Sequence, residues 1–354
     1  MATATAIETL TAAAGTLKLQ PQRLQKEPLK YNGSFDDKGR VDLTPLIGTE
    51  FPKSMQVSQI LKAQNSDALL KELAVLISER GVVFLKDQDI TLEQQQELAH
   101  RLGVQAGKPS TSHLHIHPLT PEGSERGDQI YVISSQNKEY GTEDRQLIKK
   151  GGQDVWHSDI SYERIPSDYS TLKVTQLPPS GGDTLWASGY EVYDRLSKPY
   201  RKFLESLTAT HQANNFHETA KKHNFKLRDP RGSPDNSDLT FEAVHPVVRT
   251  NPVTGWKSVY VNRLITKRIN DVTEKESEAI LDYIQEVVRQ NHDLQVRYKW
   301  GKNDLAIWDN RSTVHAATFD YGTQLRFGER AVSLGERPYL DPNSKSRREA
   351  LGEE

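Results

Sequence analysis

The sequence predicts an α+β fold that is mostly β, a β-sandwich or jelly roll with helices packed on its outside. Short apolar segments with strand character recur along the chain. Helical periodicity is strongest near the start of the chain and in one late segment. Strands and helices therefore do not alternate as they do in folds built on a parallel sheet, and antiparallel sheets flanked by helices fit better.

Three segments have the apolar spacing of amphipathic helices. Residues 68–80 carry apolar side chains at helical intervals, and Gly81 can end that helix. Thr91 can cap a second helix over residues 93–102. Residues 274–290 have the most regular helical spacing of the chain.

Short apolar and β-branched runs bounded by turn residues predict the strands. They are residues 82–85, 129–134, 170–176, 258–262, 294–298, 305–308 and 325–334.

The chain of 354 residues shows no internal repeat and no low-complexity linker, so one catalytic domain is the simplest organisation. We expect this domain to span residues 36–340. Residues 1–35 have weak periodicity and are expected to form a flexible or loosely docked N-terminal arm. Residues 341–354 are predicted to be a charged, frayed C-terminal tail.

Composition narrows the functional classes. Lysine plus arginine (46) nearly balance aspartate plus glutamate (48), which gives no reason to expect a nucleic acid as partner. The absence of cysteine excludes disulfides, cysteine-ligated zinc, iron–sulfur clusters and thiol nucleophiles. No apolar run has the length of a membrane span, and no secretory signal is evident. The cytoplasm is the default location, with an N-terminal transit peptide as the alternative.

The segment Trp156-His157-Ser158-Asp159 contains two side chains that can bind a metal. In an extended segment His157 and Asp159 point to the same side and can converge on one ion. His315 is the candidate third ligand. Two imidazoles and one carboxylate that leave coordination positions open are typical of non-haem Fe(II) oxygenases. Taken alone, a His-x-Asp pair is more often a hydrogen-bonded core feature.

Two further features each have two interpretations. Thr184 follows a turn rich in proline and glycine, where its hydroxyl can either bind a carboxylate ligand or cap the turn. Arg326 and Arg330 lie four residues apart and share one face of an extended strand. Their guanidinium groups can bind a carboxylate, sulfonate or phosphate, or can form salt bridges with neighbouring side chains.

His113, His115 and His117 stand at alternate positions, so in a strand their side chains would lie on one face. From the residues alone, they suggest a zinc site separate from the His157–Asp159 pair. The protein would then be a zinc metallohydrolase, an alternative class of enzyme. A catalytically silent protein of the same fold is another alternative, although it would require a broken triad.

Five blocks between about residues 80 and 340 resemble, in order, the taurine/2-oxoglutarate dioxygenase family. They are WHSD (156–159), PPSGGDTLWASG (178–189), AVHPVVRTNPVTG (243–255), NDLAIWDNRSTVHAA (303–317) and LRFGERAVSLGERP (325–338). The resemblance implies a double-stranded β-helix (jelly roll) core with flanking helices. It also implies Fe(II) as cofactor, 2-oxoglutarate as cosubstrate, and ascorbate as the reductant for work in vitro.

The resemblance assigns roles to individual residues. The implied iron ligands are His157, Asp159 and His315, with Trp308 close behind them. Thr184 and Arg326 would hold the distal carboxylate of 2-oxoglutarate, and His117 and Arg330 would hold the anionic group of the substrate. The remaining pocket positions depart from the family pattern: Gln153 replaces an asparagine, Phe216-His217 replaces an aromatic pair, and Ile265 and Thr120 stand where aromatics are expected.

The reaction implied by the resemblance is hydroxylation of the carbon that bears an alkyl sulfonate. It consumes O2 and 2-oxoglutarate and releases an aldehyde, sulfite, succinate and CO2, in the service of sulfur assimilation. The departures make a larger or more apolar alkyl sulfonate as plausible as taurine. The alternative substrates are an alkyl sulfate ester and an aryloxy carboxylate. The resemblance to the family leads us to expect a homo-oligomer. We expect no membrane partner.

Overall fold

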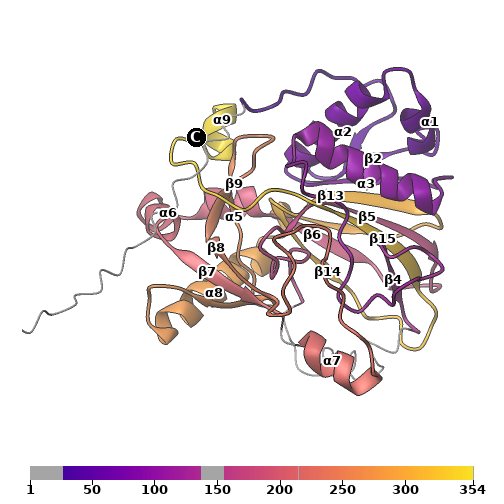
Figure 1. Cartoon of the computed structure of the whole chain (residues 1–354). Coiled ribbons are helices and arrows are strands. Elements are labelled where there is room, and N and C mark those ends of the chain that lie inside the picture. Colours follow the sequence, from indigo (N-terminus) through magenta and orange to yellow (C-terminus); the bar gives the residue numbers. More distant parts are fainter. Residues whose placement is uncertain (1–26, 137–154, 214, 354) are drawn as a thin grey trace, which may run out of the picture.

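The computed structural model describes residues 27–136, 155–213 and 215–353. Its largest sheet has seven strands in the order β1-β2-β3-β13-β5-β15-β4 (Figure 1). Their bounds are β1 (Val41–Asp42), β2 (Thr49–Phe51), β3 (Val82–Leu85), β13 (Asp304–Asp309), β5 (Ser167–Gln176), β15 (Phe327–Leu334) and β4 (Ile130–Ser134). All neighbouring strands are antiparallel except β2 and β3, so strands distant in sequence meet at the centre.

A three-stranded sheet faces the large one. It consists of β12 (Gln295–Tyr298), β6 (Thr184–Ser188) and β14 (Thr313–Ala317), with β6 in the middle. Alternate side chains of β13 show how the layers meet. Ala306 and Trp308 belong to a buried cluster with Trp186 of β6, whereas Leu305 and Ile307 pack on the opposite side against helices. This period of two makes β13 the centre of a sheet buried on both faces.

Helices α1 (Val57–Lys62), α2 (Ser66–Arg80) and α3 (Leu92–Ala106) cover the outer face of the seven-stranded sheet (Figure 1). Thr91 caps α3 as predicted: its hydroxyl accepts a hydrogen bond from the Gln94 amide, and the Gln94 side chain accepts one from the Thr91 amide. Such reciprocal caps stabilise a helix by about 1 kcal/mol.

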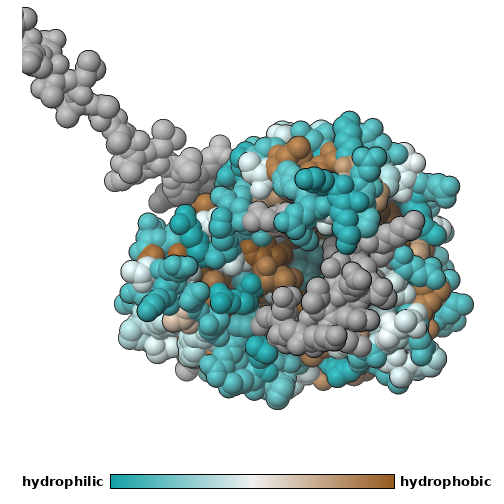
Figure 2. Space-filling model, turned by 90° about the horizontal axis from the view of Figure 1, so that it is seen from below, coloured by the Kyte–Doolittle hydropathy of each residue, from teal (hydrophilic) through white to brown (hydrophobic). Residues whose placement is uncertain are grey.

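The second half of the chain adds two smaller sheets and another group of helices. The sheets are β11 (Thr266–Ile269), β7 (Thr208–Gln212) and β8 (Glu242–Pro246), and the pair β10 (Lys257–Val259) and β9 (Val248–Thr250). The helices are α5 (Gly189–Arg195), α6 (Lys198–Glu205), α7 (Asn215–His223), α8 (Glu274–Gln290), the 3-10 turn His292–Leu294 and α9 (Arg347–Leu351). The face on the side of α7 is hollowed near its centre, and apolar residues line part of that hollow (Figure 2).

The structure confirms the three predicted helices and all seven predicted strands, although β10 ends at Val259 rather than near residue 262. The mostly β, α+β class is also confirmed. Several elements were not predicted, among them α5, α6, β7 and β14, because the few apolar residues in each give no clear hydrophobic period.

The C-terminal tail is not frayed, contrary to the prediction. Residues 347–351 form α9, which Ser346 caps, and the Arg348 guanidinium bonds the buried carboxylate of Glu191 at 2.7 Å. Buried acidic partners explain the order of this basic segment.

The expected N-terminal arm lies mostly outside the described residues. Its last part docks, because Phe35 is 2% exposed and packs in the core beneath α2. None of the described helices is long and apolar enough to cross a membrane.

Candidate metal centre and neighbouring anion site

Backbone pairing brings the first and last candidate ligands together. The amide of His157 donates to the carbonyl of His315 at 3.0 Å, and the amide of His315 donates back to the carbonyl of His157 at 2.8 Å. This isolated bridge joins the segment before β5 to β14, so the two imidazole rings lie 4.3 Å apart, centroid to centroid.

The three side chains present their ligand atoms to one point. The Nε2 atoms of His157 and His315 are each 3.9 Å from Oδ1 of Asp159, and the candidate ligand atoms all lie within 4.8 Å of one another. Nδ1 of His157 lies 2.8 Å from the Val155 carbonyl, to which it can only donate. That bond leaves the Nε2 lone pair available, as a metal ligand requires. The donor set therefore fits an Fe(II) with open positions.

Asp159 is held from two sides. Its Oδ2 accepts a 2.8 Å hydrogen bond from Ser170 on β5, and its backbone amide donates to Oδ1 of Asn310 at 3.1 Å. Asn310 also accepts from the indole of Trp308 at 2.9 Å and donates to Ser170 at 2.8 Å. One buried amide side chain thus connects the ligand carboxylate with β5 and β13.

The turn that carries Asn310 is itself fixed by a buried ion pair. The Arg311 guanidinium bonds the Asp309 carboxylate at 2.8 Å, and Ser78 of α2 donates to the same carboxylate at 2.7 Å. Arg311 and Asp309 are at most 1% exposed. Because a broken buried pair is costly, this arrangement keeps the turn in place.

The prediction that Trp308 lies beside the metal site agrees with the geometry. Its ring centroid is 5.0 Å from that of His315, and Trp186 stacks at 6.3 Å from the same imidazole. Both indoles are almost fully buried, and His315 packs against them between the two sheets.

The protonation states suit metal binding. Burial alone would raise the pKa of Asp159, but the charge of Arg330 and the two imidazoles hold it at about 2. Burial and the neighbouring His157 lower the pKa of His315 to about 3, and burial lowers the pKa of His157. At neutral pH the site therefore presents one carboxylate and two neutral imidazoles.

The candidate 2-oxoglutarate residues both contact Trp300. The Trp300 indole donates to the Thr184 hydroxyl at 3.1 Å, and the Arg326 guanidinium carbon lies 5.8 Å from the centroid of the Trp300 ring. Nε of Arg326 donates to the Gly182 carbonyl at 3.0 Å. A Cβ on Gly182, whose φ is +75°, would lie 3.0 Å from Cδ of this arginine. Glycine at position 182, in the turn before β6, therefore leaves the space that the Arg326 side chain occupies.

The candidate substrate residues His117 and Arg330 meet next to the metal ligands. Nη1 of Arg330 donates to Oδ1 of Asp159 at 2.5 Å. Nδ1 of His117 accepts from the Leu119 amide at 3.3 Å, which leaves the proton of the neutral ring on Nε2. Burial, reinforced by the charge of Arg330, lowers the pKa of His117 well below its usual value. His117 is therefore a neutral hydrogen-bond donor in this structure.

Two of the other predicted pocket residues, Phe216 and Ile265, are apolar. The rings of Phe216 and His117 are nearly perpendicular, with centroids 5.4 Å apart, and Phe216 belongs to a buried cluster against which Ile265 packs. The cluster also contains Leu119, Ile160, Tyr162, Ile165, Ala220, Phe241, Val332 and Leu334. Thr120 is buried nearby in sequence, whereas Gln153 lies outside the described residues.

The alternating histidines lie on a segment that forms only an isolated bridge, at Leu114, and not a strand, although the rings of His115 and His117 are 6.5 Å apart. His113 stacks near His100, His115 lies 3.5 Å from the Glu163 carboxylate, and His117 faces Tyr131. Among the described residues, His157, Asp159 and His315 form the one group of three that could hold a metal. The geometry gives no support to a zinc site at the 113–117 segment.

Several residues of the site had no predicted role. Asn310 and Trp300 stand within or beside recognised blocks, but their contacts depend on which strands pair. Ser170 and Tyr131 belong to predicted strands, and only the sheet register places them at the site. A sequence pattern with a period of two gives the face of a residue but not its partner.

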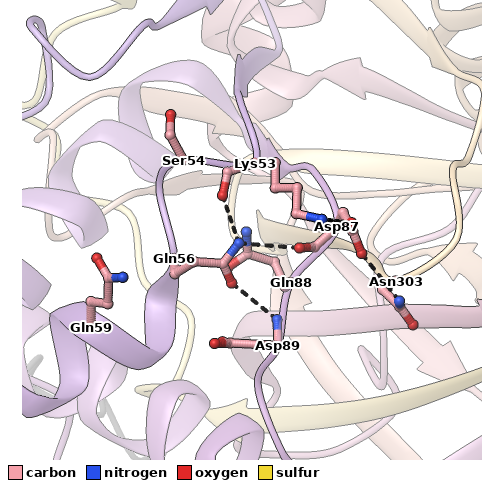
Figure 3. Close-up of a pocket in the computed structure, with 8 residues that line it drawn as sticks. All are labelled: Lys53, Ser54, Gln56, Gln59, Asp87, Gln88, Asp89 and Asn303. Atoms are coloured by element: carbon pink, nitrogen blue, oxygen red, sulfur yellow. Dashed lines mark hydrogen bonds and ion pairs between the residues drawn. The ribbon is translucent and has the colours of Figure 1, made fainter.

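A separate polar pocket of about 540 Å³ lies between the start of α1 and the turn after β3 (Figure 3). Its side chains bond one another: Lys53 pairs with Asp87 at 2.6 Å, and Gln56 bonds the backbone of Lys53, Asp87 and Asp89. None of its lining residues is a candidate metal, cosubstrate or substrate residue. This pocket is a hydrogen-bonded junction between two turns.

Comparison with known proteins adds a family to this geometry. Residues 40–332 match the family described as taurine catabolism dioxygenase TauD, TfdA family. The alpha-ketoglutarate-dependent dioxygenase oryG of Aspergillus oryzae is 48% identical over 331 residues, which cover 92% of this chain and 96% of that protein. An alpha-ketoglutarate-dependent sulfonate dioxygenase of Saccharomyces cerevisiae is 32% identical over 84% of this chain and 67% of its own length. The crystal structure of a taurine dioxygenase from Burkholderia xenovorans superposes with a TM-score of 0.63 at 25% identity, over 86% of this chain and 91% of that one.

Proposed function

The chain belongs to the taurine catabolism dioxygenase TauD, TfdA family and is an alpha-ketoglutarate-dependent dioxygenase, and we propose that its substrate is an alkyl sulfonate with an apolar body. The hydroxylated carbon is the one bonded to sulfur. The product then breaks its C–S bond and gives an aldehyde and sulfite, while 2-oxoglutarate gives succinate and CO2. The two facing sheets would form the double-stranded β-helix core expected from the sequence. A role in sulfur assimilation stays a prediction.

His157, Asp159 and His315 would hold Fe(II), and Arg326 and Thr184 would hold the distal carboxylate of 2-oxoglutarate. When bound, a non-haem Fe(II) supplies the activation of O2 that hydroxylation requires. The protein supplies position: three fixed ligands on one side, a guanidinium for the cosubstrate, and a second guanidinium for the substrate.

The observation that carries the proposal is the place of Arg330. Its Nη1 touches a ligand carboxylate at 2.5 Å, and its Nε is buried without a hydrogen-bond partner among the described residues. A buried guanidinium N–H without a partner is costly, and an anion would satisfy it. An anion bound there would lie beside Asp159, a candidate metal ligand. The Nε2–H of His117 would provide the second donor.

The proposed preference for a substrate with an apolar body rests on the residues around the candidate anion site. Two of the described residues predicted to line the pocket beyond the anion, Phe216 and Ile265, are apolar and belong to or pack against one buried apolar cluster. The nearby carboxylate of Glu163 is bound by both Nε and Nη2 of Arg231, at 2.5 and 3.0 Å. Because Arg231 compensates its charge, Glu163 offers little attraction to the ammonium group of taurine. Each additional buried methylene of a substrate contributes about 0.8 kcal/mol.

The test is product release from the protein supplied with Fe(II), ascorbate, 2-oxoglutarate and one anion at a time. Hexanesulfonate should release sulfite in step with succinate, with a kcat/KM at least about tenfold above that of taurine, since several more methylenes are buried. Hexyl sulfate and phenoxyacetate test the alternatives, because they would release sulfate and phenol instead. Succinate coupled only to either of those products would replace the sulfonate assignment.

Variants separate the two arginines. Arg330→Gln should lower kcat/KM for the sulfonate by roughly 30-fold or more, as expected for the loss of a buried charged partner. Arg326→Gln should instead raise the 2-oxoglutarate concentration required. Arg101→Gln, which removes a surface arginine of α3, is the matched control. Equal effects of Arg326→Gln and Arg330→Gln on both ligands would contradict the division of roles.

A further inference from the structure

Tyr131 touches both residues of the candidate anion site. Its ring stacks on the imidazole of His117, with centroids 3.8 Å apart and planes inclined by 25°. The guanidinium carbon of Arg330 lies 5.3 Å from the centroid of the same ring.

The sheet register explains this position. β4 is the last strand of the seven-stranded sheet, and Tyr131 on β4 pairs directly with Arg330 on β15. Side chains of directly opposed residues in an antiparallel pair lie on the same face, within about 5.5 Å at Cβ. The backbone thus places the phenol ring beside the guanidinium group.

The imidazole of His117 is held on three sides. Tyr131 covers one face, the ring of Phe216 lies at 88° to the imidazole, and the Leu119 amide bonds Nδ1. Tilting of the imidazole would break the stacking, whereas a half-turn within its plane would break the hydrogen bond from the Leu119 amide. The ring of Tyr131 therefore fixes the plane of the imidazole and keeps Nδ1 aligned with that amide, which leaves the proton on Nε2.

The guanidinium of Arg330 is likewise confined. Asp159 bonds one end, and the ring of Tyr131 attracts the cation through its negative face. An arginine side chain without such a neighbour has many rotamers, and ordering them on binding costs free energy. A guanidinium already in place binds an anion more tightly.

We propose that Tyr131 is a positioning residue that fixes His117 and Arg330 as one preformed anion site. The inference rests on the proposed function, because it concerns the site that would hold the substrate anion. It makes the ring, rather than the hydroxyl, the group that matters. It also places a determinant of substrate affinity on β4, a strand that carries no candidate metal or cosubstrate ligand.

The experiment measures binding without turnover. The anaerobic complex with Fe(II) and 2-oxoglutarate is titrated with hexanesulfonate by calorimetry, in the wild type, Tyr131→Phe and Tyr131→Leu. Loss of both ring contacts should weaken anion binding by about 10- to 30-fold in Tyr131→Leu. Tyr131→Phe should bind within about twofold of the wild type. Fe(II) and 2-oxoglutarate affinities should not change. Tyr283→Leu, at an exposed tyrosine of α8, is the control.

A second measurement reports on His117 without any substrate. In protein labelled with ¹⁵N-histidine and loaded with Zn(II), NMR should show His117 as the Nε2–H tautomer in the wild type and in Tyr131→Phe. In Tyr131→Leu the same ring should show exchange between tautomers. The inference is overturned if Tyr131→Leu retains both wild-type affinity and a single tautomer, or if Tyr131→Phe is as impaired as Tyr131→Leu.

Failure of the proposed function is recognised separately. If the wild type binds hexyl sulfate or phenoxyacetate but not hexanesulfonate, the sulfonate assignment fails. The same titrations with the anion that does bind, together with the NMR measurement, then decide on Tyr131.

Discussion

The two ends of the candidate site are held by different kinds of interaction. At the metal end, hydrogen bonds with fixed directions connect Asp159 to Ser170 and Asn310, all on or beside central strands. At the anion end, stacked and edge-on rings hold His117, and they come from an edge strand and a helix. Hydrogen-bonded geometry is specific, whereas aromatic packing tolerates exchange of one apolar group for another.

This difference indicates where the site can change. Replacement of one residue at the metal end leaves buried polar groups unpaired in the middle of the sheet, at a cost to every function of the site. Replacement at the anion end repacks an apolar wall and alters which substrate fits. The departures from the family pattern, at Phe216 and Ile265 among others, fall at the second end.

The largest expected effect is at His315. His315→Ala removes one of three ligands, so Fe(II) binding and succinate formation should fall to background. Calorimetric titration with Fe(II) under nitrogen and a succinate assay measure the two. His292→Ala, which removes an exposed histidine, should behave as the wild type. Succinate formation at the normal rate in His315→Ala would remove this residue from the metal site.

A smaller effect is expected at Asn310, which touches no ligand atom of the triad. Asn310→Ala deletes the acceptor for the Asp159 amide and the donor to Ser170, and should weaken Fe(II) binding by about 10- to 100-fold. The exposed Asn343→Ala is the control. Normal Fe(II) binding by Asn310→Ala would contradict the distinction between the two ends of the site. An equal loss of Fe(II) affinity in Tyr131→Leu would contradict it as well.

The smallest expected effect is on the pH dependence of stability, and it concerns the buried histidine His245. Burial, aided by the charge of Arg249, lowers the pKa of His245 to about 3, and its Nε2 donates to the carbonyls of Ser161 and Glu163. Between pH 6.5 and 3 the unfolded chain binds a proton here that the folded chain does not. Stability therefore falls as the pH falls, by about 1.4 kcal/mol per pH unit from this group.

His245→Gln keeps a donor and removes the titration. In metal-free protein, the free energy of unfolding by urea should depend on pH less steeply in this variant, by about 1.4 kcal/mol per unit between pH 6 and pH 5. The kcat at pH 7 should stay within about twofold if the variant folds. An unchanged slope would assign the acid sensitivity to other buried groups.

The part of the site predicted from the sequence is the part with short-range signals. His157 and Asp159 stand two residues apart, and the blocks around Thr184, His315 and Arg326 are specific to a family. Their convergence agrees with the structure, although their roles stay predictions. The prediction for the C-terminal tail was wrong because nothing near Arg348 in the sequence indicates its distant partner, Glu191.

The part that could not be predicted depends on register. Tyr131 meets Arg330 only because β4 and β15 take one particular register, and Trp308 pairs with Ser170 only because β5 and β13 do. Similarly, the segment 113–117 has the alternation of a strand but forms only an isolated bridge at Leu114, and its histidines do not form a metal-binding group. Long-range pairing decides these contacts, and a local pattern contains no information on it.

The backbone bridge between His157 and His315 also has a consequence for when the protein can take up its metal. The two ligands lie on segments separated by almost half of the chain, and contacts of such sequence separation form late in folding because a long loop must close first. During synthesis His315 leaves the ribosome long after His157. The complete set of three candidate ligands therefore forms only once these two segments have paired. From then on, bound metal adds RT ln(1 + [M]/Kd) to stability, about 2.7 kcal/mol at a hundredfold excess over Kd.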